Sequence, residues 1–284
     1  MTLVLASGYQ GITDPDAATY ITAVEAADGQ AIEGDVAFAV NDFVVGCKAD
    51  GIWDAIKASC ILAGARTLSG ALVPLKGTAP NNFNFVSGDY DRKTGLKGNG
   101  STKYLNSNRN NNADPQNNNH NAAYVTALED GNFLMGATGS TCAENGSNSI
   151  NGAGFSRNRS STGTAFTATA VAGFFGMSRN LSTSYTVRAA STNETILVAS
   201  SGLFNADVLI YRRSCSSSPT YTSSRLSFYS IGESIDLEKL DNRTTRLMNL
   251  ISYSLASGLP DLSTMDIDAA LYIGAIYRAG GTLS

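Results

Sequence analysis

The N-terminal quarter of the chain carries the hydrophobic period of helices. Over residues 14–29 apolar side chains recur at every third or fourth position, with Asp14 or Asp16 placed to cap the helix and Gly29 just beyond its end. The same period returns over residues 35–47 and 52–63. This pattern predicts three helices in succession.

The middle of the chain is patterned for short strands. Brief apolar segments are separated by polar turns rich in Ser, Thr, Asn and Gly. The expected strands are 83–86, 103–106, 122–128, 133–137, 152–156, 165–168, 171–178, 185–189, 195–199, 208–212 and 226–231. Ala123, Val125 and Ala127 are expected to share one face of their strand, and Leu226 and Phe228 one face of theirs. So many short strands indicate a sandwich or barrel.

Helical spacing returns near the C-terminus. After Gly232, apolar residues recur at spacings of three and four, and Asp236 is the expected N-cap. Residues 266–281 also repeat much of the sequence of residues 14–29, including Asp-x-Asp-Ala-Ala-x-Tyr-Ile. The repeat predicts one amphipathic helix type used twice; the alternative is two similar Ala-rich helices with the same capping chemistry.

Together these patterns predict a mainly β protein with helices at both ends. The expected divisions are an N-terminal helical module (1–65), a linker (66–82), a jelly-roll β-sandwich (83–235) and C-terminal helices (236–284).

The composition of the chain excludes two classes of partner, nucleic acids and the membrane interior, from those expected. Only 15% of the residues are charged, the formal net charge is −4, and Lys and Arg form no basic stripe, so no nucleic-acid partner is expected. No run reaches the roughly 20 apolar residues that cross a bilayer, so membrane insertion is not expected. The N-terminus lacks the basic n-region of a signal peptide.

The cysteines and the tryptophan are expected to be structural. Cys47 and Cys60 lie in helix-patterned sequence and are expected as small buried residues. Cys142 and Cys215 lie in Ser-rich segments and could approach each other, but without an export signal free thiols are favoured. Trp53 is expected to anchor the core of the helical module.

Four segments carry a resemblance to a known class of protein. Residues 20–33, 43–53, 88–105 and 225–237 resemble bacteriophage virion structural proteins in which a short helical module precedes a laminin G-like, concanavalin A-like jelly roll. The resemblance implies a capsid decoration or a tail or baseplate part, assembled in the host cytoplasm and located in the virion. Its partners would be other virion proteins and further copies of itself, a trimer being common among such proteins. The alternative is a tail-fibre receptor-binding protein that recognises host-surface glycans.

A glycan hydrolase is the third class considered. Retaining hydrolysis needs two carboxyl groups about 5 Å apart. The cluster of Glu233, Asp236 and Glu238 does not have the alternate spacing that would place such groups on one strand face, and Asp236 is better explained as a helix cap. No catalytic residue and no enzyme activity are therefore predicted.

An Asn-rich loop supplies the remaining candidate chemistry. Residues 106–119 offer many side-chain carbonyls but one carboxylate, Asp114, so a calcium site is not favoured and no metal or cofactor is predicted. Asn amides could instead recognise sugars. The sole histidine, His120, is expected as a polar loop residue. The candidate ligand-binding residues are Tyr104, Asn108, Arg109, Asn111, Asp114 and Tyr221.

Overall fold

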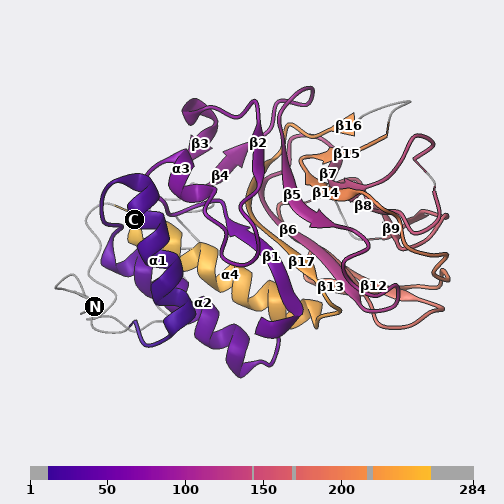
Figure 1. The fold of residues 1–284 in the computed structure, drawn as a ribbon, viewed down its shortest axis with the longest axis horizontal. Coiled ribbons are helices and arrows are strands. Elements are labelled where there is room, and N and C mark those ends of the chain that lie inside the picture. Colours follow the sequence, from indigo (N-terminus) through magenta and orange to yellow (C-terminus); the bar gives the residue numbers. More distant parts are fainter. Residues whose placement is uncertain (1–11, 143, 168–170, 216–219, 257–284) are drawn as a thin grey trace.

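Two antiparallel sheets stack as a sandwich, and helices cover one of its sides (Figure 1). The computed structural model describes residues 12–142, 144–167, 171–215 and 220–256. The predicted fold class, a mainly β jelly-roll sandwich with helices before and after it, is confirmed. The second copy of the internal repeat, 266–281, lies outside the described residues. Within them, no helix is both long and apolar enough to cross a membrane.

Within the described residues, one sheet has eight strands and the other has seven. The eight-stranded sheet runs in the order β13 (Thr192–Ile196), β12 (Tyr185–Ala189), β11 (Gly173–Arg179), β6 (Asn119–Ala127), β17 (Arg225–Gly232), β4 (Gly95–Lys97) and β3 (Tyr90–Asp91), with β1 (Ile56–Ile61) also paired to β17. The seven-stranded sheet runs in the order β10 (Thr164–Ala165), β9 (Phe155–Asn158), β8 (Asn148–Asn151), β7 (Phe133–Ala137), β14 (Asp207–Ile210), β5 (Tyr104–Asn110) and β2 (Asn81–Phe83). A separate hairpin pairs β15 (Arg212–Arg213) with β16 (Thr220–Tyr221).

The helices begin where local chemistry predicts. In α1 (Pro15–Asp28) the Asp14 carboxylate accepts from two backbone N–H groups of the first turn, and Gly29 follows in the left-handed conformation. Asp236 caps α4 (Leu237–Ser254) in the same way. The remaining helices are α2 (Gly34–Ala49) and the short α3 (Leu68–Ala71). Of the two candidate caps for the first helix the structure uses Asp14, and the predicted cap Asp236 is confirmed. Helix α3 falls inside the segment expected as a linker.

The central strands of the eight-stranded sheet are buried on both faces. Along β6, Ala122 and Tyr124 join the cluster formed by α1, α2 and α4, while Ala123 and Val125 face the seven-stranded sheet. The predicted shared face of Ala123 and Val125 is confirmed. A buried ion pair between Arg188 of β12 and Asp241 of α4, at 2.8 Å, also joins the helical layer to the sheet. The structure thus has three layers, and the described helices lie outside the eight-stranded sheet.

The third predicted helix is wrong, because residues 56–61 form strand β1. This strand pairs with β17, for example Cys60 with Tyr229. Ile56 and Ile61 pack toward the helices, whereas Ala58 and Cys60 pack into the sandwich. A strand buried on both faces is apolar throughout, so its sequence does not differ in period from a buried helix.

Strand β17 also differs from the expectation. Leu226 lies in the core between the sheets, but Phe228 faces the helices. The pairing register of β17 with β6 shifts between these two residues, and such a bulge reverses the faces of the residues that follow it. The predicted shared face of Leu226 and Phe228 is therefore wrong.

Several strands and strand ends were not predicted because their residues are polar. Strand β8 was not predicted, because three of its four residues are Asn or Ser. Strands β5 and β6 extend into the Asn-rich segment, which leaves only residues 111–118 as the connecting loop. Trp53 is buried as expected, and its indole N–H donates to Asp16.

The prediction for His120 is wrong, since the residue is fully buried on β6. Its Nδ1 contacts the carbonyl oxygen of Glu233, and its Nε2 lies 2.7 Å from the Ser230 hydroxyl oxygen. A carbonyl can only accept, so Nδ1 carries the proton and Nε2 accepts from Ser230. Burial lowers the pKa of His120 to about 4, although the Glu233 carbonyl, and the more distant Asp114 charge, favour protonation.

We therefore expect an acid-sensitive fold. Between about pH 6.5 and pH 4 the unfolded chain binds a proton at His120 that the folded chain does not, so the free energy of unfolding falls as the pH falls. The loss reaches roughly 3 kcal/mol at pH 4. Urea unfolding at several pH values measures it, and His120→Gln is the control because the chain has one histidine. A slope as steep in His120→Gln as in the parent protein would contradict the assignment.

Candidate functional site

The outer face of the seven-stranded sheet is the surface opposite the helical layer. The strand registers align one row of outward-facing positions across this face, formed by Asn81, Asn106, Leu209, Gly136, Ser149 and Arg157. The neighbouring positions along the strands, such as Leu105, Met135 and Ile150, belong to the sandwich core. The β15–β16 hairpin leaves the end of β14 and lies against β7 on this side.

Four side chains at one end of this face form what we call the aromatic–arginine surface: Phe83, Tyr104, Arg212 and Tyr221. The Phe83 and Tyr104 rings are stacked, with centroids 4.3 Å apart and planes 3° apart. Tyr221 meets Tyr104 edge-on at 6.1 Å. The Arg212 guanidinium lies 4.8 Å from the Tyr104 centroid and 5.0 Å from that of Tyr221. Phe83 keeps 37% of its surface exposed, so the cluster is open to a ligand.

Arg212 owes its position to aromatic contacts. It forms no ion pair with any described residue, and its buried Nε has no hydrogen-bond partner. Two rings hold the cation through its planar face. A guanidinium held in this way keeps its N–H donors available, while the stacked rings offer an apolar face. This is the combination that recognises a ligand with both apolar ring faces and hydroxyl groups.

Asn side chains border the aromatic–arginine surface along β2 and β5. Asn81 donates to the Asn108 side chain at 3.1 Å, and Asn108 donates to the Ala79 carbonyl at 2.8 Å. Asn106 donates to the Asp207 carboxylate at 3.0 Å. These bonds hold the amides on the outer face and leave each with unused hydrogen-bonding capacity.

The predicted ligand-binding residues divide into two groups. Tyr104 and Tyr221 meet on the outer face, although 116 residues lie between them. Arg109, near the end of β5, and Asp114, in the loop that follows, form an ion pair at 2.5 Å, and Asp114 is only 3% exposed. Asn111 is buried and donates to the Gly146 carbonyl. Asn108 and this second group all have structural partners, so their contribution to binding stays a prediction.

Sequence reasoning missed Phe83 and Arg212. Phe83 was assigned to a first strand without a role, and Arg212 to the end of another strand. The signal that could have found Arg212 is Tyr211-Arg212-Arg213, two adjacent cations directly after a buried apolar strand. Nothing local indicates that Phe83 stacks on Tyr104, because that contact depends on the pairing of β2 with β5.

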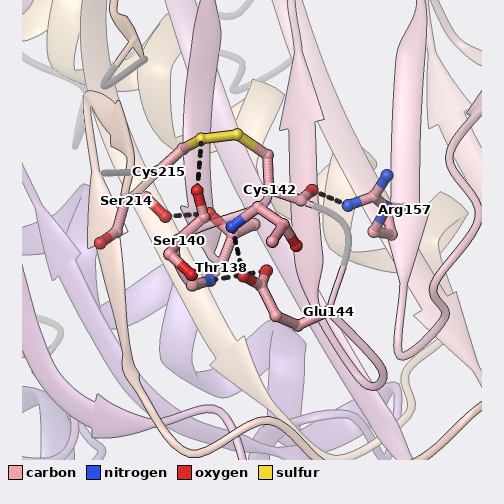
Figure 2. The surroundings of a disulfide bond; sticks show 9 residues. Thr138, Ser140, Cys142, Glu144, Arg157, Ser214 and Cys215 are labelled. Atoms are coloured by element: carbon pink, nitrogen blue, oxygen red, sulfur yellow. Dashed lines mark hydrogen bonds between the residues drawn. A yellow bond between two sulfur atoms is a disulfide. The ribbon is translucent and has the colours of Figure 1, made fainter. Parts of the chain in front are cut away.

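The expectation of free thiols at Cys142 and Cys215 is wrong, because the two residues form a disulfide (Figure 2). Their Cα atoms are 5.1 Å apart, within the usual range of such a bond. Cys142 follows β7 and Cys215 follows β15, and these strands lie side by side. A Thr138 hydroxyl that donates to the Ser214 carbonyl supports the same junction. Cys47 and Cys60 are buried thiols, as predicted.

The acidic cluster near β17 has structural partners. Asp236 caps α4, and Glu233 lies 3.3 Å from the Lys57 ammonium. Among the described residues, no group of three or more His, Cys, Asp or Glu side chains has the geometry to hold a metal ion.

No protein-family model and no curated protein matches the sequence. Among solved structures, the botulinum neurotoxin serotype D binding domain aligns with 67% of this chain and 51% of its own, at 10% identity and a TM-score of 0.41. A mutant of Trypanosoma rangeli sialidase displaying trans-sialidase activity aligns with 69% of this chain and 33% of its own, at 10% identity and a TM-score of 0.39. The binding domain of botulinum neurotoxin DC, in complex with SialylT, aligns with 55% and 42%, at 13% identity and a TM-score of 0.31. The chain spans about half of the first of these structures and less of the other two.

Proposed function

We propose that this protein is a glycan-binding β-sandwich carried in a phage virion, and that its outer sheet face is the binding surface. The observation that carries the glycan part is the aromatic–arginine surface. Sugar rings have apolar C–H faces that pack on exposed aromatic rings, and hydroxyl groups that accept from a guanidinium and exchange hydrogen bonds with amides. Phe83, Tyr104 and Tyr221 offer the rings, and Arg212 offers the donors.

The layered fold suits this role. The helices occupy the outer face of the eight-stranded sheet, so the face that carries the aromatic–arginine surface points away from them. In a particle, the helical side would attach to other virion proteins and the opposite face would meet the host. The virion part of the proposal rests on the sequence resemblance. Counting copies of the chain in intact particles tests this part. Many copies on the shell support a decoration protein, and a few copies at one vertex support a tail or fibre part. The absence of the chain from the particles would contradict a virion location.

The proposed binding role predicts that a double variant loses affinity for the glycan. Tyr104→Ala with Tyr221→Ala removes both rings that flank Arg212, and we expect binding to host-surface polysaccharide to weaken at least about tenfold. Retention on immobilised polysaccharide and titration calorimetry measure it. Leu197→Ala is the matched control, since Leu197 is 84% exposed beside the other sheet. Equal binding by the double variant and the parent would exclude this surface as the site.

A further inference from the structure

Beside the aromatic–arginine surface lies a second cluster with an unmatched positive charge. It consists of Arg157, Arg213 and Ser149, with Phe133 and Phe155, and we call it the basic cluster. Arg213 lies with its guanidinium 3.9 Å from the Phe133 ring centroid. The Arg157 guanidinium is 6.0 Å from that of Phe155, and the two rings meet edge-on at 5.8 Å.

The sheet provides room for this cluster. Gly136, Ser149 and Arg157 are consecutive members of the outward row on β7, β8 and β9. Gly136 and Ser149 are small, so the Arg213 side chain can lie over β7. A Cβ added at Gly136 would lie 3.4 Å from the Arg213 Cγ. Both arginines are therefore placed over the same patch of the outer face, on either side of Ser149.

Several polar atoms of the cluster are buried without partners. Arg157 is only 7% exposed, and one of its terminal nitrogens donates to the Cys142 carbonyl, a contact drawn in Figure 2. The Nε atoms of Arg157 and Arg213 and the Ser149 hydroxyl have no hydrogen-bond partner among the described residues. Unsatisfied buried groups of this kind are rare in folded proteins and call for a ligand or an ordered water.

No carboxylate of the described chain neutralises the two arginines. Neither forms an ion pair with a described residue. Glu144 is near enough to favour the charged form of Arg157, but its oxygens accept from the backbone N–H groups of Gly139 and Thr141. Burial lowers the pKa of both guanidiniums, and their mutual repulsion lowers that of Arg213 further. Arginine stays protonated at neutral pH all the same, so the cluster carries two positive charges.

We propose that the basic cluster binds an anionic substituent, a carboxylate or a sulfate, of the glycan that occupies the aromatic–arginine surface. This inference rests on the proposed function. Arg212 lies over Tyr104 of β5 and Arg213 over Phe133 of β7, and only β14 separates these two strands in the sheet, so a sugar ring on the first surface places its neighbouring unit over the second. Two guanidiniums form the donor set that an oxyanion takes, and the bonds are charge-assisted. The ligand is accordingly an acidic glycan.

Matched glycans test the inference. The probes are dextran, carboxymethyl-dextran and dextran sulfate, together with lactose and 3′-sialyllactose, each titrated into the full chain. The variants are Arg213→Gln and Arg157→Gln, and Arg246→Gln is the control for loss of one positive charge, since Arg246 is paired with Asp42 on the helical side. Thermal unfolding of each variant shows whether it folds; Arg213→Gln carries the test if the more buried Arg157→Gln does not.

We expect the parent protein to bind an anionic form at least about tenfold more tightly than its neutral counterpart, and Arg213→Gln to abolish that preference without weakening the neutral form. A preference for the carboxylated or for the sulfated polymer identifies the anion. Equal binding of neutral and anionic forms, or an anionic preference that survives Arg213→Gln, would show that the basic cluster is not the anion-binding site and would leave the proposed function intact. Binding of no glycan by the parent protein overturns both.

Discussion

Arg179→Ala is expected to lower the free energy of unfolding by about 4 kcal/mol, a large share of the about 5–15 kcal/mol by which folded domains are stable. Arg179 ends strand β11 and is fully buried. Its guanidinium donates to the carbonyl oxygens of Asn158, Leu181, Ser184 and Val198, at 2.8–3.1 Å. Asn158 belongs to the seven-stranded sheet and the others lie around the end of the eight-stranded sheet. Removing the side chain leaves all four carbonyls without this donor, and the contacts to Asn158 and Ser184 are buried.

The variant Arg179→Lys separates the contribution of the positive charge to stability from that of the hydrogen-bond geometry. Lysine keeps the positive charge but has three donors on one nitrogen, so it cannot span acceptors on both sheets. We expect it to recover less than half of the lost stability in urea unfolding. Arg66→Ala, at a half-exposed arginine paired with Glu33, is the control and should cost about 1 kcal/mol or less. A fully stable Arg179→Ala would show that water satisfies these carbonyls.

The sequence predicts those features of the fold that short-range chemistry determines. Asp14 and Asp236 cap helices because a carboxylate two or three residues ahead of free N–H groups acts locally. Strands β7 and β12 match their predicted bounds because polar turns border each of them. Strand β1 was misassigned because burial on both faces removes the alternation that marks a strand.

Features that depend on which strands become neighbours could not be predicted from the sequence. Tyr104 and Tyr221 are among the ligand-binding residues predicted from the sequence, but Arg212 has a role only because the β15–β16 hairpin places its guanidinium against both rings. Arg179 carries no local signal either, since a charged residue at a strand end is normally exposed. The same holds for Cys142 and Cys215, whose strands are brought together only by the order of the seven-stranded sheet and its hairpin.

Loss of the disulfide is the second large expected effect. The bond closes a loop with a sequence separation of 73 residues, and the chain-entropy model assigns such a loop about 4 kcal/mol of stability. We expect Cys142→Ser with Cys215→Ser, or reduction of the parent protein, to lower the free energy of unfolding by that order. Cys47 and Cys60 are already thiols, so reduction leaves them unchanged. Burial raises the pKa of both to about 12, which keeps them from attacking the disulfide.

Reduction should also weaken binding before the fold is lost. The disulfide joins the segment whose Cys142 carbonyl holds Arg157 to the hairpin that carries Arg212, Arg213 and Tyr221. Without it, these groups must be ordered when the glycan binds, and that ordering reduces affinity. Titrating the same glycan into oxidised and reduced protein, both below their unfolding transitions, measures the difference, and the double serine variant should match the reduced form. Equal affinity in both forms would show that the hairpin holds its position without the bond.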